Sequence, residues 1–147
     1  MINNILKDEE YKHLILKQSK ETIELLMAKN VEFAVTANLK GLHFEPDLPK
    51  SIKSKLANFS LFVLSNYTYT TISLSDTTMT FEAGFGAENF ATIVSVPYIS
   101  IFQIVIDESI IFINTLATMD DLQEQNNFHD KSMNVFKNNP SNKDLLD

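Results

Sequence analysis

The side chains that could carry acid–base or metal chemistry are few in this chain and lie far apart. Its three histidines, His13, His43 and His129, have no spacing typical of a metal site, and there is no cysteine to act as a thiolate or a ligand. His43 with Glu45 and Asp47 could bind a metal ion, but a polar loop explains that cluster more simply. Neither a Gly-x-Ser-x-Gly elbow nor a glycine-rich phosphate loop occurs. The sequence therefore predicts neither an enzyme nor a cofactor.

Residues 79–86 carry the clearest pattern in the chain. Apolar positions alternate there with polar or small ones, as Met79, Phe81, Ala83 and Phe85 against Thr80, Glu82 and Gly84. A period of two is typical of a strand with one buried face. The pattern ends at Gly86, where the missing side chain lets another backbone come close. On spacing alone, this segment is a half-buried strand followed by a glycine turn.

Two motifs in this region resemble the SspB family, bacterial adaptors that carry ssrA-tagged proteins to the ClpXP protease. They are Phe81-Glu82-Ala83-Gly84-Phe85-Gly86-Ala87 and Val94-Ser95-Val96-Pro97-Tyr98-Ile99-Ser100-Ile101. The family carries a Phe-x-x-x-Phe-Gly-Gly-type strand and then a Val-x-Val-Pro-x-x-x-Ile/Leu segment. The resemblance covers roughly residues 9 to 116, and residues 11–29 are more similar to the alphaproteobacterial branch. In two departures, Ala87 replaces a family glycine and Gly84 stands where some branches have Arg.

The resemblance implies a cleft for an extended peptide tag, built from two regions of the chain. A peptide in such a cleft is bound by main-chain hydrogen bonds and small side-chain pockets. Residues 80–86 would supply backbone groups, and a polar segment before them would read the amides of an Asn-containing tag. The predicted peptide-binding residues are Ser65, Asn66, Tyr67, Phe81, Ala83, Gly84, Phe85 and Gly86. Phe81 and Phe85 could instead belong to the core.

Residues 9 to 29 are predicted to form a helix whose apolar arc is unusually wide. The arc spans roughly 200°, about twice what a helix packed on one surface needs. One face holds Tyr11, Leu14, Ile15, Leu25 and Leu26, and a second holds Leu16, Ile23 and Met27. Such a helix either packs on a partner as well as on its own domain, or lies deep in a groove of its own barrel. Because the SspB family dimerises through this helix, we expect a homodimer with the second face at the interface.

Residues 31 to about 116 are predicted to form mainly strands. Apolar residues alternate over 31–37, and the run 59–65 is largely apolar, as expected for a strand covered on both faces. Residues 40–49 are predicted to form a loop before a helical turn opened by Pro49. The remaining predicted strands are 69–74, 78–85, 91–96, 102–106 and 110–116. Many short strands at regular spacing predict a mainly β, α+β fold. With the resemblance, the expected fold is a small SspB-like β-barrel with one N-terminal helix.

From about residue 118 the chain is polar and acidic without periodicity, which is typical of a disordered tail. We therefore expect a tag-binding and dimerisation domain over 1–117 and a tail over 118–147. Met133, Val135, Phe136 and Lys137 resemble a degenerate form of the tail peptide with which alphaproteobacterial SspB binds the zinc-binding domain of ClpX; Leu145-Leu146 is the rival. A flexible linker of about 14 residues before this motif would reach roughly 20 Å.

Composition limits the other function classes. The net charge is −7 and all 12 basic residues are lysines, so nucleic acid is not an expected partner. A small-barrel RNA-binding module is nevertheless the alternative hypothesis, since Tyr67, Tyr69 and Phe90 would suit base stacking. No apolar run is long enough for a membrane span, and the N-terminus lacks the features of a signal peptide. We expect a cytoplasmic protein without a membrane partner.

Overall fold

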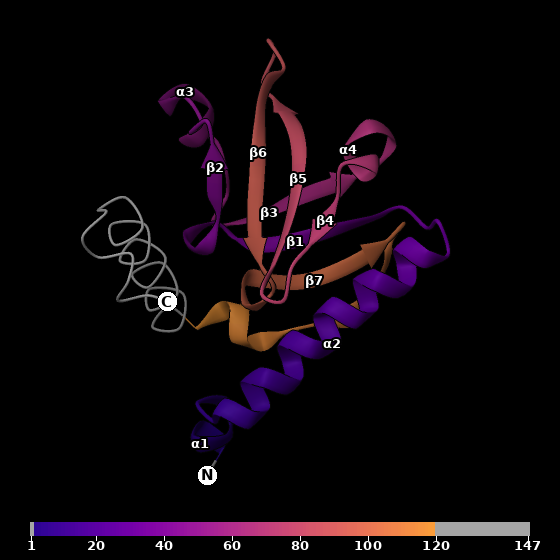
Figure 1. The fold of residues 1–147 in the computed structure, drawn as a ribbon. Coiled ribbons are helices and arrows are strands. Elements are labelled where there is room, and N and C mark those ends of the chain that lie inside the picture. The colour runs from indigo at the N-terminus through magenta and orange to yellow at the C-terminus, as the bar shows by residue number, and fades with distance from the viewer. Residues whose placement is uncertain (1, 120–147) are drawn as a thin grey trace, which may run out of the picture.

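The structure is a computed structural model that describes residues 2–119, and it opens with a short and a long helix (Figure 1). These are α1 (Ile2–Leu6) and α2 (Glu9–Ala28). Asp8 caps α2, because its carboxylate Oδ1 accepts hydrogen bonds from the backbone N–H groups of Glu10 and Tyr11 at 2.8 and 3.0 Å. The helix ends before Asn30, whose φ of 57° is left-handed. The predicted helix over 9–29 is confirmed.

Eight strands follow within the described residues. They are β1 (Phe33–Asn38), β2 (His43–Glu45), β3 (Phe59–Leu64), β4 (Ser73–Leu74), β5 (Thr78–Phe85), β6 (Phe90–Pro97), β7 (Ile101–Ile106) and β8 (Ser109–Ile113). Four short helices lie between them: η1 (Leu39–Gly41), α3 (Lys50–Lys53), α4 (Asn66–Thr70) and η2 (Tyr98–Ser100). A fifth, η3 (Thr115–Thr118), follows β8. The helical turn after Pro49 is therefore confirmed as α3.

The strands form two antiparallel sheets of four strands each. Sheet A has the order β3-β1-β7-β8, and sheet B has the order β2-β6-β5-β4. The α+β class is confirmed, but the expected closed barrel is not formed by the described residues. Sheet B ends in strands of three and two residues, which are too short to bridge to the other sheet.

The core lies between the inner faces of the two sheets, and α2 covers part of it. Phe62 of sheet A and Phe81 of sheet B meet there with ring centroids 6.0 Å apart. Ile23 and Leu26 of α2 belong to the same buried cluster. Each fully buried side chain of this size contributes about 1.5–3 kcal/mol to stability. The alternation predicted for the first strand is confirmed, since Phe33, Val35 and Ala37 are all buried.

The expectation that β3 is covered on both faces is wrong. The apolar run at 59–65 was predicted to be covered on both faces, and only one face is covered. Ser60, Phe62 and Leu64 are buried, whereas Leu61 and Val63 are 60% and 62% exposed. An apolar run has no period, so the sequence alone could not show which face would be left uncovered.

The predicted dimer interface is wrong at Ile23. Its side chain has no exposed surface in the single chain, and it therefore cannot be offered to a partner. Leu16 and Met27 are half-buried and pack against the same core. The apolar residues that α2 does expose are Leu14 and Leu25, at 48% and 55%. The wide apolar arc is thus explained largely by burial within this chain.

The segment predicted as a loop over 40–49 contains β2, which pairs with β6. His43, Phe44 and Glu45 lie opposite Ser95, Val94 and Ile93. Three residues give too short an alternation to stand out from a loop. The pairing matters for function, because it places Glu45 beside the outer face of sheet B.

Candidate functional site: a groove on the outer face of sheet B

A cavity of about 610 Å³ lies over the outer face of sheet B, between α4 and the residues that follow β2. We call it the sheet B groove. It is lined by Glu45, Pro46, Ser65, Asn66, Tyr67, Thr68, Glu82, Ala83, Gly84, Asn89, Ala91, Thr92 and Ile93. Its volume falls within the range of about 300–1,000 Å³ that is usual for ligand pockets.

Helix α4 forms one wall and is held in place by carboxylates. Asn66 begins the helix with a left-handed φ of 52°, which asparagine tolerates, and its backbone N–H donates to Glu32 Oε2 at 2.6 Å. Tyr67 is 68% exposed, and its hydroxyl donates to Glu82 Oε2 at 2.9 Å. This hydrogen bond and the negative charge of Glu82 raise the pKa of Tyr67. The phenol ring is thus fixed over β5 with its hydroxyl protonated at neutral pH.

The floor is made by residues of β5 and β6 that share the outer face. Glu82 lies opposite Ile93, and Gly84 lies opposite Ala91. Gly84 has no side chain, and a Cβ there would overlap the carboxamide oxygen of Asn89. The floor is therefore flat at Gly84, with an amide directly above it that can donate and accept hydrogen bonds.

One edge of β5 is open beside this floor. β4 pairs with β5 only at Thr80 and Met79, and the next N–H on that edge, from Glu82, donates to Thr71 Oγ1 at 2.9 Å. In an extended strand every second residue directs its N–H and C=O to the same edge, so the backbone of Gly84 points the same way. No strand among the described residues pairs with it there. An extended peptide could add to the sheet at this point.

The opposite wall belongs to the segment after β2. Thr92 Oγ1 donates to the backbone oxygen of Pro46 at 2.6 Å, which fixes this segment against β6. The carboxylates of Glu45 and Glu82 are the charged groups of the lining, which contains no basic residue. The groove can therefore offer hydrogen bonds and a negative field to a ligand, but no counter-charge for an anion.

Five of the eight predicted peptide-binding residues line the groove: Ser65, Asn66, Tyr67, Ala83 and Gly84. The structure thus brings together the two segments that the sequence analysis paired. Ala83 is half-buried and also packs against the core.

The other three predicted residues lie elsewhere, which corrects that prediction. Phe81 is 1% exposed and fills the core. Phe85 packs edge-on against Phe44 with ring centroids 6.0 Å apart. Gly86 has a φ of 76° in the turn after β5, and a Cβ there would lie 3.2 Å from Ile52. Alternation places Phe81 and Phe85 on the inner face, so strict use of that period would have excluded both.

Sequence reasoning missed several residues of the groove. Glu82 shares its period with Gly84, and this signal could have found it. Asn89 lies in the turn between β5 and β6, and Thr92 lies opposite Ala83 in the same hairpin. The pair Glu45–Pro46 is distant in sequence and is brought to the groove by the pairing of β2 with β6. No local sequence pattern predicts a contact between segments so far apart.

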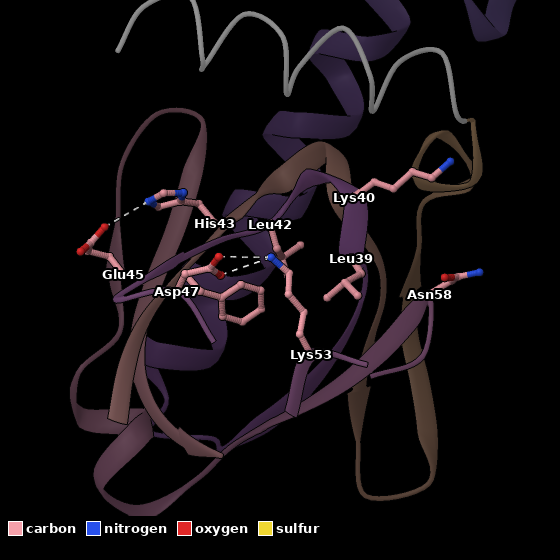
Figure 2. Close-up of a pocket in the computed structure, with 9 residues that line it drawn as sticks. Leu39, Lys40, Leu42, His43, Glu45, Asp47, Lys53 and Asn58 are labelled. Carbon is pink, nitrogen blue, oxygen red and sulfur yellow. Dashed lines mark hydrogen bonds and ion pairs between the residues drawn. The ribbon is translucent and has the colours of Figure 1, made fainter. Parts of the chain in front are cut away.

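A second cavity, of about 580 Å³, is lined by all three residues of β2 and by residues of η1 and α3 (Figure 2). His43 Nε2 faces Glu45 Oε2 at 3.8 Å, while Asp47 Oδ1 pairs with Lys53 Nζ at 3.2 Å. The hydrogen bond from Lys53, with one from the backbone of Leu48, lowers the pKa of Asp47. Because Asp47 is turned to a lysine, the three side chains considered as a metal site do not converge, and residues 2–119 hold no group of three such ligands.

The predicted tail motif of Met133, Val135, Phe136 and Lys137 lies outside the described residues, as does His129. Within the described part of the chain, no helix combines the length and the apolar character needed to cross a membrane.

The fold and the groove define an α+β protein of two packed sheets with an open, peptide-sized groove. The chain matches no protein-family model. A search of curated proteins finds no match either.

Proposed function

We propose that this protein is a proteolytic adaptor that binds ssrA-tagged polypeptides in the sheet B groove and tethers them to ClpXP. One observation carries the proposal. Residues 65–67 and the strand at Ala83 and Gly84, which the SspB resemblance pairs as a tag cleft, line one cavity beside an open strand edge. The finer description of the fold as SspB-like is part of the same proposal.

The chemistry of the groove supports a peptide in extended form. The backbone of Gly84 lies at the open edge of β5, and the Asn66 and Asn89 side chains offer amides that match those of an Asn-containing segment. Each net hydrogen bond contributes about 0.5–1.5 kcal/mol, so several are needed for a micromolar complex. The adaptor does no chemistry on its ligand, and it acts in the cytoplasm with the protease.

The proposed tether belongs to residues 118–147, with Met133, Val135, Phe136 and Lys137 as the contact for the ClpX zinc-binding domain. Linking the two binding events raises the local concentration of tagged substrate to the order of millimolar. A homodimer would present two such tails and gain avidity.

The RNA-binding alternative is opposed by the charges around the exposed aromatic residue. Tyr67 is the aromatic residue of the groove lining, but its hydroxyl donates a hydrogen bond to the carboxylate of Glu82, and Glu45 adds a second negative charge to the lining. A phosphate backbone in this groove would meet repulsion instead of the lysine and arginine contacts that bind it. We therefore keep the peptide as the proposed ligand.

Fluorescence anisotropy with a labelled peptide of the host's ssrA tag tests the proposal. Tyr67→Ala should weaken binding at least tenfold, about 1.4 kcal/mol, because it removes one wall of the groove. Leu25→Ala, exposed on α2 and remote from the groove, is the control and should bind as the wild type does. Absence of binding by the wild-type full chain, or equal binding by both variants, would reject the groove as the tag site.

A further inference from the structure

The outer face of sheet B carries one row in which an exposed isoleucine lies between two carboxylates. Residues that pair directly across antiparallel strands share a face of the sheet. Ile93 of β6 lies opposite Glu82 of β5 on one side and opposite Glu45 of β2 on the other. All three residues line the sheet B groove, and Ile93 is 46% exposed. The row therefore offers an apolar surface with a negative charge at each end.

The two carboxylates are too far apart to form one metal site. Two strand spacings separate Glu45 from Glu82, which places their backbones about 10 Å apart. A calcium ion instead draws six or more oxygen atoms to within about 2.6 Å. Residues 2–119 contain no group of three side chains that could hold a metal ion. The row better fits a ligand that combines a long apolar stem with a positive charge.

Tyr67 adds an aromatic surface beside the carboxylate of Glu82. Its ring is exposed, and its hydroxyl donates to Glu82 Oε2 at 2.9 Å. The face of such a ring attracts a cation that lies within about 6 Å of its centre. A carboxylate accepts more than one hydrogen bond, so Glu82 can bind a second donor while it holds Tyr67. Glu45 Oε2 lies 3.8 Å from His43 Nε2, which is too far for a hydrogen bond that would hold this carboxylate.

We infer that the row of Glu45, Ile93 and Glu82 is a subsite for a lysine or arginine side chain of the bound peptide. The inference rests on the proposed function, because it names the charge of the peptide that the groove takes. Lysine and arginine pack a methylene stem on apolar surface while the charged head stays in water. Such a stem can cross one strand spacing, about 4.8 Å, from a peptide at the open edge of β5. In the next row the carboxamide oxygen of Asn89 lies over Gly84 and adds a neutral acceptor.

The same charges should exclude an acidic side chain from this position. A peptide carboxylate there would face Glu82 and Glu45, and the lining holds no basic residue to offset the repulsion. Attraction for one charge and repulsion of the other both contribute to specificity. The preceding row on this face, which consists of Thr80, Ser95 and His43, holds no carboxylate. The preference should therefore be confined to one position of the peptide.

Fluorescence anisotropy of the full chain with three sets of labelled peptides tests the inference. In each set the residues of the host's ssrA tag peptide are replaced one at a time, by lysine, by glutamine or by glutamate. We expect one position at which the lysine peptide binds at least tenfold tighter than the glutamate peptide, with glutamine between them. High salt should reduce this ratio, because exposed charges are screened.

A matched pair of variants assigns the preference to the row. Glu82→Gln should lower the ratio at least about threefold, while the glutamine amide oxygen can still accept the Tyr67 hydrogen bond. Glu108→Gln, in the turn between β7 and β8 of sheet A, changes the net charge by the same amount and should leave the ratio unchanged. Circular dichroism melts identify a variant that fails to fold, and Glu45→Gln provides a second variant of the row.

The outcomes separate this inference from the proposed function. Binding of the parent tag peptide with no position that prefers lysine to glutamate would overturn the inference and leave the adaptor proposal standing. A ratio that falls equally in Glu108→Gln and Glu82→Gln would also overturn it, because the net charge of the chain would then be the cause. A lysine peptide that binds when the parent does not would support the inference and reject the tag as the ligand. If no peptide of any set binds, both proposals are wrong.

Discussion

Gly84 and Gly86, at the end of β5, have different structural roles, and alanine substitutions should distinguish these roles. Gly84 lines the groove, and an alanine there would displace the Asn89 side chain, which is free to rotate away. Gly86 lies outside the lining and has a φ of 76°, where a Cβ is strained by roughly 1–2 kcal/mol. We expect Gly84→Ala to lower tag-peptide affinity about tenfold at nearly unchanged stability, about 1.4 kcal/mol of binding free energy.

Gly86→Ala is the control for this experiment and should show the converse, lower stability with unchanged affinity. Anisotropy titrations and urea melts of both variants provide the two measurements. If Gly84→Ala binds the peptide as tightly as the wild type does, the floor at Gly84 and Asn89 is not part of the binding site.

Tyr98 should make stability depend on alkaline pH. Its side chain has no exposed surface, and its hydroxyl donates to the backbone oxygen of Ser75 at 2.7 Å. Burial, with the negative charges of Glu24 and Asp76, raises its pKa to about 12. The unfolded chain ionises this group near pH 10, so its contribution is complete below pH 10 and is lost between pH 10 and about 12.

The loss amounts to roughly 2 kcal/mol by the top of that range. Tyr98→Phe lacks the titrating group, so its unfolding free energy should fall less steeply above pH 10, while lysine titrations affect both proteins alike. Urea melts at several pH values measure the difference. Parallel stability curves for the two proteins would show that the Tyr98 pKa is not raised by folding.

At the scale of elements, the apolar pattern of α2 predicts the helix but does not show which of its apolar residues are buried. Its existence and ends follow from an apolar pattern of helical period and from the Asp8 cap. A wheel treats Ile23 and Leu25 as equally apolar, yet their exposures are 0% and 55%. Which part of a wide arc is buried depends on the sheets beneath it, and these are assembled from segments up to a hundred residues away.

Because Ile23 is buried and Leu25 is exposed, alanine substitutions at the two positions should affect the unfolding free energy differently. Removing three methyl or methylene groups at Ile23 leaves a cavity in the core and should lower the unfolding free energy by about 2–5 kcal/mol. Leu25→Ala should change it by less than about 0.5 kcal/mol, as is usual for exposed positions. Urea unfolding of both variants, at a protein concentration where the oligomeric state is the same, gives the comparison. Equal destabilisation would contradict the packing of α2 described above.

The strands were predictable where a period was long enough to be read. β1 and β5 carry six and eight residues of alternation, and both follow the prediction. β2 has three residues and was predicted as part of a loop. The strand predicted over 69–74 is wrong in its first half, where helix α4 (Asn66–Thr70) continues to Thr70, and only β4 (Ser73–Leu74) is extended. The groove depends on both kinds of strand. Its floor was therefore visible in the sequence, whereas its second wall at Glu45 and Pro46 was not.

At the scale of the whole molecule, the two outer sheet faces divide the surface into a polar groove and an apolar face. The fold places them back to back, so the groove and the exposed apolar residues of β3 lie on opposite sides of the molecule. The sequence alone pointed to the floor of the groove, but it predicted that the run at 59–65 would be covered on both faces. The reason is that an apolar strand such as β3 and a buried strand have the same composition, and only the strand order shows that nothing among residues 2–119 covers the outer face of β3.

Removing residues 120–147 should separate tag binding from delivery to the protease. Leu116 and Ala117 have no exposed surface, and the Ala117 backbone oxygen accepts a hydrogen bond from Asn38 Nδ2 at 2.9 Å. A cut inside η3 would break this contact, whereas a chain ending at Met119 retains it. We expect that chain to keep its melting temperature and its tag-peptide affinity, and to lose enhancement of degradation because substrate and ClpX are no longer linked.

Two smaller changes then locate the contact within the removed segment. Phe136→Ala should reproduce the loss if the motif at 133–137 binds ClpX, since an aromatic anchor often dominates a short interface. Deleting 144–147 instead tests Leu145-Leu146. Degradation of a tagged reporter by ClpXP, at substrate concentrations well below half-saturation of the protease, is the measurement. A chain ending at Met119 that still accelerates degradation as well as the full chain would show that delivery does not use a tail tether, however tightly the groove binds the tag.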